Sequence, residues 1–360
     1  MSNLFIAFFI SCFTTILIIR TQKLHQRFSG DCLLDGPQKF HTTTVPRVGG
    51  IGIALGICIA IASNLRSSPD QGFEYTLLLC AAPVFAIGLV EDLCKRVSVK
   101  TRLLFTAIGA LLATILLGAQ IPSLDIPGID YLLTLPALSI LLTIFAITGV
   151  SNAYNIIDGF NGLSSMVAII TLLALGYVSM VLGDPLLARL NFTMASAILG
   201  FFIWNYPRGL IFLGDGGAYL IGFWVATLSV LVVARHSEVS PWFALMINGY
   251  PILETLFTIY RRKIHQGKSP GQPDGIHFHS LIFRRILNSK VIKNENEWFS
   301  ANAKTSPYLW ILTTLSIVPA MIFWHDTAIL IAFLVLFTLS YVWLYGRIVS
   351  FRTPRWMHVD

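Results

Sequence analysis

Long apolar runs separated by short polar segments fill this chain of 360 residues. A helix that crosses a bilayer needs about 20 consecutive apolar residues, and runs close to that length recur from one end of the chain to the other. They are residues 3–19, 48–64, 76–91, 102–119, 132–150, 162–182, 186–204, 210–234, 242–260, 308–324 and 327–346. The pattern predicts an all-α, polytopic integral membrane protein with about eleven transmembrane helices.

Composition supports this fold class. Only 12% of the residues are charged and the mean hydropathy is +0.72, whereas soluble domains contain about 25% charged residues. The longest polar segment, about 261–306, is too short to suggest a second domain, and no internal repeat is evident. Residues 1–360 are therefore expected to form a single transmembrane domain.

The distribution of Lys and Arg predicts the orientation. With the N-terminus outside, all but three of the 25 Lys and Arg residues fall on the inner side, the exceptions being Arg66, Arg189 and Arg235. This asymmetry follows the positive-inside rule and places the C-terminus in the cytoplasm. It also accounts for the net charge of +7 without a nucleic-acid partner, because no recognition motif accompanies the basic residues. Cytoplasmic loops are expected at about 21–47, 92–101, 151–161, 205–217 and 261–306.

Nearly all candidate chemistry lies in these inner loops. The first, "DGPQKFHTTTVPRVGG", carries Lys39, His41, Arg47 and a Gly49-Gly50 turn, which indicates either a phosphate-contacting loop or glycines that let helices pack closely. The second places Glu91 and Asp92 side by side at a span end. Adjacent carboxylates repel one another, so they indicate a metal or a cationic partner, unless they form a helix-end salt bridge with neighbouring bases.

The third loop is "NAYNIIDGFNGL", with polar residues at every third position: Asn152, Asn155, Asp158 and Asn161. On a helix, Asn152, Asn155 and Asp158 would share one face. Gly159 and the glycine at 162 are expected to break or bend that helix. Simple capping of a helix end is the alternative, but four amide or carboxylate side chains exceed what a cap requires and favour a lined cavity.

The fourth loop contains Asp215 between two apolar runs, followed by two glycines. An acid at the centre of a membrane helix costs about 2.5–3.5 kcal/mol on insertion scales, which favours a hydrated site at this position. The fifth loop is strongly basic and contains Arg262, Lys263, His277 and His279. In an extended segment the two histidines would point to opposite sides. Their spacing does not indicate zinc, so anion contact is the favoured interpretation and a solvated basic loop the alternative.

Together, three clusters of acids or amides and two basic loops face the same side of the membrane. This arrangement is typical of a site for a divalent cation and a phosphorylated ligand, and hard oxygen ligands suit Mg²⁺. An ion-coupled membrane transporter is the competing hypothesis. Transporters place their ionisable residues near the midplane, often on broken helices within inverted repeats, whereas these acids lie at span ends.

Five motifs in order, "VPRVGG", "EDLCKRVSVKTRL", "NAYNIIDGFNGL", "FLGDGGAYLIGF" and "HFH", make the chain resemble the polyprenyl-phosphate N-acetylhexosamine-1-phosphate transferases over roughly residues 35–285. The resemblance implies transfer of N-acetylhexosamine 1-phosphate, by default GlcNAc 1-phosphate, from a UDP-N-acetylhexosamine to undecaprenyl phosphate. UMP is released, and the lipid diphosphate sugar initiates a cell-surface polysaccharide such as O-antigen. The implied setting is the cytoplasmic side of the bacterial inner membrane, among membrane lipids, with a homodimer allowed.

The resemblance also implies residue roles. Asp215 and Asn155 would bind Mg²⁺, with Mn²⁺ as an alternative, and Asp92, Glu91 and Asp215 would be catalytic. On our interpretation Asp92 positions the acceptor or the metal and Glu91 is secondary, because a phosphate monoester with a second pKa of about 6 has little proton to lose. The substrate-binding residues would be Lys39, Asn152, Asp158, Asn161, Arg262, Lys263, His277 and His279.

Four positions depart from the family pattern. Glu91 replaces a usual Asp, Asn161 stands where many bacterial members have Asp, Ala218 replaces a frequent Ser, and Ser280 stands where a further His is common. The missing triple histidine favours the GlcNAc-loading branch over the peptidoglycan-precursor branch. GalNAc, QuiNAc and FucNAc remain open as alternative sugars.

Overall fold

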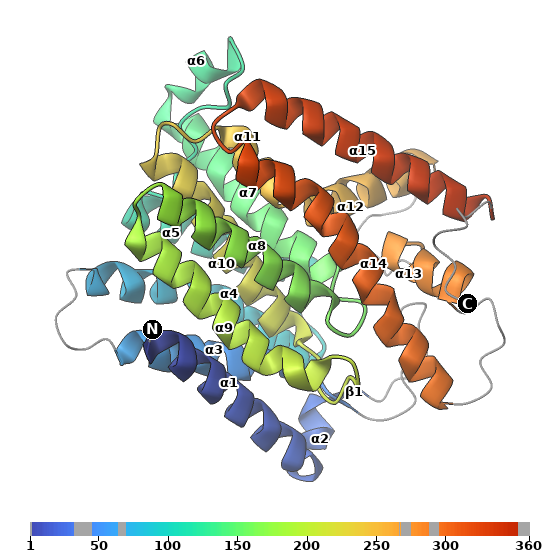
Figure 1. The fold of residues 1–360 in the computed structure, drawn as a ribbon. Helices are drawn as coiled ribbons and strands as arrows, with labels where there is room; N and C mark the ends of the chain where they lie inside the picture. Colours follow the sequence, from blue (N-terminus) through green and yellow to red (C-terminus); the bar gives the residue numbers. More distant parts are fainter. Residues whose placement is uncertain are drawn as a thin grey trace.

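A computed structural model describes residues 2–31, 45–63, 70–265, 267, 275–287 and 295–351. Within these ranges the chain is almost entirely helical (Figure 1). The helices are α1 (Ser2–Arg20), α2 (Gln22–Ser29), α3 (Gly50–Ala62), α4 (Gln71–Cys94), α5 (Val99–Leu117), α6 (Ile129–Leu133), α7 (Pro136–Ile156), α8 (Leu163–Val181), α9 (Pro185–Asn205), α10 (Gly214–Arg235), α11 (Pro241–Ile247), α12 (Gly249–Tyr260), α13 (Phe278–Ile282), α14 (Glu295–Ile322) and α15 (Thr327–Val349). Two π-helical turns, η1 (Arg261–His265) and η2 (Phe283–Leu287), follow α12 and α13, and strands β1 (Gly30–Asp31) and β2 (Val45–Pro46) pair antiparallel.

Every predicted apolar stretch coincides with a helix or with the consecutive pair α11 and α12. Among the described residues, nine helices are long and apolar enough to cross a membrane, and α11 with α12 forms a tenth candidate bent by 78°. The remaining stretch is α3, whose 13 residues extend only about 20 Å at 1.5 Å per residue. The predicted all-helical membrane fold is confirmed. The count of eleven crossings and the orientation of the termini stay predictions.

Helix α10 is the centre of the bundle. It packs against α3, α4, α7, α8 and α9, and 94% of its apolar window is buried inside the protein. A membrane helix surrounded by other helices needs no polar face, and from Gly216 to Val233 every residue of α10 is buried. The first turn of this helix therefore presents Asp215 at a fixed place within the bundle.

Glycines let the neighbouring helices approach the backbone of α10. A Cβ added to Gly88 of α4 would lie 2.6 Å from Cα of Gly216, and one added to Gly50 of α3 would lie 2.4 Å from the backbone nitrogen of Gly217. Small residues at such contacts are characteristic of membrane helix packing. Because backbone meets backbone there, α3, α4 and the first turn of α10 form one close-packed unit, which we call the glycine contact.

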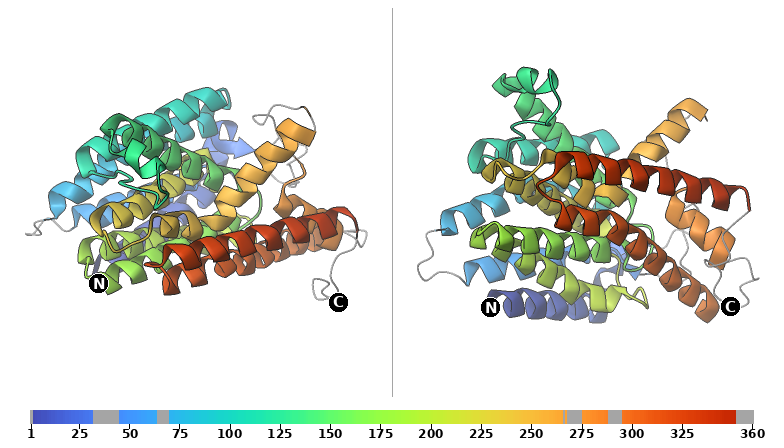
Figure 2. Two further views of the ribbon diagram at one scale, coloured as in Figure 1. Left: turned by 90° about the horizontal axis from the view of Figure 1, so that it is seen from above. Right: turned by 45° about the horizontal axis from the view of Figure 1, so that its top comes forward.

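Helices α14 and α15 run along one side of the bundle, and the end of α12 extends away from it (Figure 2). The short helix α13 packs against both α14 and α15. The bend between α11 and α12 falls at Asn248, whose amide nitrogen donates to the hydroxyl of Ser229 on α10 at 3.0 Å. This arrangement carries α12 toward the segment that contains the two histidines.

Candidate active site

Asp215 lies at the start of α10, held by two arginines. It is 3% exposed, and one carboxylate oxygen accepts a hydrogen bond from the Arg47 guanidinium at 2.5 Å. The other oxygen is paired with the guanidinium of Arg102, on the first turns of α5. Two cations therefore neutralise this acid at the end of a membrane helix.

Backbone hydrogen bonds place Arg47 beside Asp215. The segment that contains Arg47 pairs with the loop leading into α10: Phe212 N–H donates to the Pro46 carbonyl, and Gly49 N–H donates to the Phe212 carbonyl, each at 2.9 Å. Gly214 has φ +76°, and a Cβ there would lie 2.3 Å from the Arg47 carbonyl oxygen. Only glycine permits both this backbone conformation and this approach.

Asp92 caps the first turn of α10. Its carboxylate, 1% exposed, accepts the backbone N–H groups of Asp215 at 2.7 Å and Gly216 at 2.8 Å. The Nε atom of Arg47 lies 3.4 Å from the same carboxylate. A helix N-terminus has unpaired N–H groups and a partial positive charge, so the carboxylate of Asp92 satisfies that terminus and fixes the backbone of Asp215.

Glu91 does not join Asp92. Its carboxylate accepts the Val97 N–H at 2.6 Å and closes the turn that follows α4, where Lys95 has φ 54°. Neighbouring residues on a helix point about 100° apart, so the two acids serve different structures. The close carboxylate pair that the sequence suggests is not formed.

The helix that contains Asn155 ends earlier than predicted. Helix α7 ends at Ile156, so Asn152 and Asn155 lie on it while Asp158 lies in the following turn. The prediction of one helical face for all three was wrong, because the helix ends before the glycine at 159. Asn152 accepts the hydroxyl of Tyr219 on α10 at 2.9 Å, and Asn155 is half-buried.

Asp158 is close enough to Arg47 and Asp215 to interact with their charges. The pKa of Asp158 is raised to about 7: burial is the largest cause, the positive charge of Arg47 opposes it, and the negative charge of Asp215 adds to it. Part of its surface is nevertheless accessible. The site therefore contains a second carboxyl group whose ionisation is costly until a cation arrives.

The polar groups of Asn161 form hydrogen bonds within the protein. It is 2% exposed, its backbone N–H donates to the side chain of Asn302 at 3.2 Å, and its amide nitrogen donates to the Pro207 carbonyl at 3.2 Å. Its own carbonyl accepts the hydroxyl of Ser306 at 2.6 Å. These contacts tie the turn before α8 to α14 and to the loop after α9. Binding of a nucleotide-sugar by Asn161 stays a prediction.

The two histidines are stacked, their ring centres 5.2 Å apart and their planes 16° apart. The segment is not extended, because α13 begins between the two histidines, at Phe278, so the opposite orientation expected of an extended segment does not apply. The ring of His279 lies against Gly159, where an added Cβ would be 2.8 Å from its Nε2. The histidine segment and the turn containing Asp158 are therefore adjacent.

The other basic residues predicted to bind substrate differ in exposure. Arg262, in η1, is buried, whereas its neighbour Lys263 is exposed. Lys39 lies outside the described residues.

The donor set has the chemistry that Mg²⁺ prefers, although the described residues contain no group of three or more His, Cys, Asp or Glu that could hold a metal. Asp215, Asp158 and Asn155 offer carboxylate and amide oxygens, which suit a hard cation. Both oxygens of Asp215 already pair with guanidinium groups. A bound ion would therefore replace at least one arginine contact.

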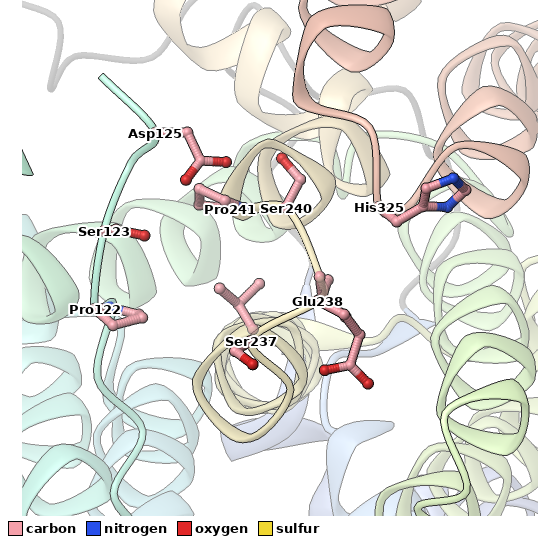
Figure 3. A pocket seen from close by; sticks show the side chains of 10 residues that line it. Pro122, Ser123, Asp125, Ser237, Glu238, Ser240, Pro241 and His325 are labelled. Atoms are coloured by element: carbon pink, nitrogen blue, oxygen red, sulfur yellow. The ribbon is translucent and has the colours of Figure 1, made fainter. Parts of the chain in front are cut away.

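A cavity of about 280 Å³ lies at the other end of α10 (Figure 3). Its ten lining residues include Asp125, Glu238 and His325, but neither Lys nor Arg. Val233 lines it, and Val233 follows Asp215 by 18 positions along α10, which is about 27 Å at 1.5 Å per residue. An acidic cavity so far from Asp215 does not suit a phosphorylated ligand.

Comparison with known proteins identifies the family. The sequence profile described as "Glycosyl transferase family 4" matches residues 75–233. An undecaprenyl-phosphate alpha-N-acetylglucosaminyl 1-phosphate transferase of Salmonella typhi is 31% identical over 285 residues, covering 77% of this chain and 76% of that protein.

The chain belongs to glycosyl transferase family 4. The undecaprenyl-phosphate alpha-N-acetylglucosaminyl 1-phosphate transferase of Escherichia coli K12 is 30% identical to this chain over 285 residues. A probable undecaprenyl-phosphate N-acetylglucosaminyl 1-phosphate transferase of Bacillus subtilis is 28% identical, and the match covers 81% of this chain and 80% of that protein. Membership makes this multi-pass membrane protein a phosphotransferase, and gives no support to the transporter hypothesis.

Two site residues were not singled out from the sequence: Arg102, which pairs with Asp215, and Glu254, which contacts His277 at 3.0 Å. Arg102 counted only toward the positive-inside asymmetry. Arg47 was assigned to a phosphate-contacting loop, but its pairing with Asp215 was not predicted. A usable signal existed, because Arg47 lies two residues before the motif's glycine pair and Arg102 follows the acid pair on the next helix. Glu254 gave a similar signal as an acid inside a predicted span.

Proposed function

We propose that this protein transfers GlcNAc 1-phosphate from UDP-GlcNAc to undecaprenyl phosphate. The observation that carries the proposal is the convergence of Arg47 and Arg102 on Asp215, with Asp158 alongside. Guanidinium groups and oxygen ligands at one membrane boundary match a pyrophosphate with its cation. The printed names of the family relatives supply the acceptor and the sugar.

In the proposed reaction an oxygen of the lipid phosphate forms a bond to the β-phosphorus of UDP-GlcNAc. The bond between that phosphorus and the oxygen bridging to the α-phosphorus breaks, and UMP leaves with that oxygen. The sugar C1–O bond is untouched, so its anomeric configuration is retained. One phosphoanhydride replaces another, and the reaction is readily reversible.

The protein's own groups would act by positioning and by neutralising charge, which dominate phosphoryl transfer. Arg47 and Arg102 would exchange their contacts with Asp215 for contacts with the pyrophosphate, and that exchange would release the carboxylate as a ligand. Mg²⁺ held by Asp215, Asn155 and Asp158 would supply further neutralisation of the phosphate oxygens.

Asp92 would be a positioning residue in this mechanism. Both of its oxygens already accept backbone N–H groups of α10, and the acceptor phosphate, with a second pKa of about 6, is largely dianionic at neutral pH. No base is therefore required, and the carboxylate of Asp92 serves to orient Asp215.

The proposed setting is the bacterial inner membrane with the active site on the cytoplasmic side, where the donor is made. The bases near the Asp215 end of the bundle, Lys95, Arg96 and Arg208, and the distant position of Arg235 at the other end of α10 support this orientation. The product would initiate a cell-surface polysaccharide.

The test is UMP release by purified protein with undecaprenyl phosphate and Mg²⁺, across UDP-GlcNAc, UDP-GalNAc, UDP-QuiNAc and UDP-FucNAc. We expect release that requires acceptor and metal and is greatest with UDP-GlcNAc. Asp215→Asn should abolish it, while Asp326→Asn, which changes the N-cap of α15 at the other end of the protein, should retain it. Folded protein that releases UMP from none of these donors would contradict the proposal.

A further inference from the structure

Glu254 is a buried carboxylate inside the bent helix pair. It lies on α12, six residues after the bend at Asn248, and is 1% exposed. An isolated buried charge is very unfavourable unless it is paired and hydrogen-bonded. Its partners therefore indicate what the residue does.

Three donors converge on this carboxylate. One oxygen lies 3.0 Å from Nδ1 of His277 and accepts the Phe278 N–H at 3.2 Å, and the other accepts the hydroxyl of Tyr341 at 2.8 Å. These partners come from the start of α13 and from α15. The side chain of Glu254 thus joins three elements that are far apart in the sequence and fixes the position of the histidine segment.

The hydrogen-bond pattern places a proton on Nδ1 of His277. Because both oxygens of Glu254 accept bonds from other donors, the carboxylate is ionised and can only accept. Nδ1 of His277 must therefore carry a proton, and the hydroxyl of Thr258, 3.2 Å from the same nitrogen, can share it. Nε2 is the ring nitrogen left for a ligand, and it donates to an oxygen ligand when the ring is the doubly protonated imidazolium, which an adjacent carboxylate favours.

Contacts connect His277 to the rest of the site. Its ring stacks on His279, the ring of His279 lies against Gly159, and Gly159 follows Asp158, which senses the charges of Arg47 and Asp215. Tyr345 adds a second tie from α15, donating to the Ile276 carbonyl at 3.1 Å. The histidine segment is therefore held from behind by α12 and α15 and faces the acidic turn in front.

We propose that Glu254 is a positioning residue: its carboxylate holds the proton on Nδ1 of His277 and stabilises the imidazolium form, whose Nε2–H then donates to an oxygen of the donor pyrophosphate. Tyr341 supports it by filling the second carboxylate oxygen. The inference rests on the proposed function for the identity of the ligand. A carboxylate behind a histidine fixes ring orientation and tautomer in the same way in metal sites.

The first test is spectroscopic and independent of turnover. In ¹⁵N-histidine-labelled protein in nanodiscs, protonated and unprotonated ring nitrogens give separate signals, and His277→Gln identifies those of residue 277. We expect a protonated Nδ1 in the wild type and a smaller protonated fraction in Glu254→Gln, whose amide can donate to that nitrogen. An unprotonated Nδ1 in the wild type overturns the proposal.

The second test is a double-mutant cycle on kcat for UMP release. We expect Glu254→Gln to lower kcat by about 10- to 100-fold, as for other residues that orient a ligand, and Tyr341→Phe to lower it less. In a His277→Gln background Glu254→Gln should have almost no further effect. Independent, additive losses would show that Glu254 does not act through His277.

Glu74→Gln is the matched control, because Glu74 is also 1% exposed and pairs with Arg189 at the other end of α4. It should leave kcat per folded molecule unchanged. The two proposals fail differently: wild-type protein with a protonated Nδ1 and no UMP release contradicts the transferase function. UMP release with an additive cycle contradicts only the role of Glu254.

Discussion

The carboxylate of Asp92 accepts the backbone N–H of Asp215 at 2.7 Å. The relationship links two acids that are 123 residues apart in the sequence, and it works through the backbone rather than through the side chain of Asp215. The direction in which the Asp215 carboxylate points therefore depends on α4 as well as on α10.

Asp92→Asn tests whether this cap or a proton transfer matters. The NH₂ group of the new amide would face one of the two backbone N–H groups, so one hydrogen bond would be lost. We therefore expect activity to fall about 10- to 100-fold at pH 6.5 and by the same factor at pH 8.5. Initial rates of UMP release at the two pH values measure this. Recovery at pH 8.5 would favour a base and refute the positioning role. Glu91→Gln, which affects only the turn after α4, is the companion variant and should cost less.

Gly88→Ala should disrupt the glycine contact. The new Cβ would lie 2.6 Å from Cα of Gly216, and overpacking of this kind costs about 1–3 kcal/mol. We expect a lower melting temperature and loss of activity. Gly72→Ala is the control on the same helix, since an added Cβ there meets nothing within 4 Å. Equal behaviour of the two variants in a thermal unfolding assay would contradict the packing argument.

Arg102→Gln should weaken the charge balance at Asp215. If the guanidinium moves to the pyrophosphate during the reaction, we expect kcat to fall about 10²- to 10³-fold, the range for loss of one transition-state donor. Steady-state kinetics with varied UDP-GlcNAc give kcat and KM separately. Arg208→Gln, an exposed arginine of the neighbouring loop, is the control. A change in stability without a change in kcat would leave Arg102 a purely structural partner.

Asp158→Asn should alter the pH dependence of stability. The folded pKa of about 7 exceeds the ordinary 3.8, so between these values the unfolded chain has lost a proton that the folded protein keeps. Stability from this group is therefore lost as pH rises from about 4 to 7. In EDTA, Asp158→Asn should be more stable than the wild type at pH 8 and close to it at pH 4.

Melting temperatures at both pH values check this prediction. A wild type that is more stable than Asp158→Asn at pH 8 would mean that Asp158 is paired in the folded state.

The local sequence pattern was sufficient to predict the helices but not the contacts between residues of different helices. The apolar runs located α10, and the isolated acid within them located Asp215. The pairing of Arg47 with Asp215 joins residues 168 positions apart, and no periodicity reports such a contact. Glu254 was overlooked because its stretch as a whole meets the hydropathy pattern of a span, although an acid within such a span is itself a signal. The helical face proposed for Asn155 and Asp158 failed because helix ends depend on tertiary contacts, here those made by the turn before α8.

The glycine contact is a rigid part of the enzyme, whereas the histidine segment is a part whose side-chain contacts can change. Where backbone touches backbone there are no rotamers to change, so the backbone around Asp215 is expected to keep the same position for every donor. The histidine segment is held by side chains, Glu254 and Tyr341 among them, and these can be exchanged without moving α10. Selection for a different sugar would therefore act on α12, α13 and α15, and leave the phosphate chemistry intact.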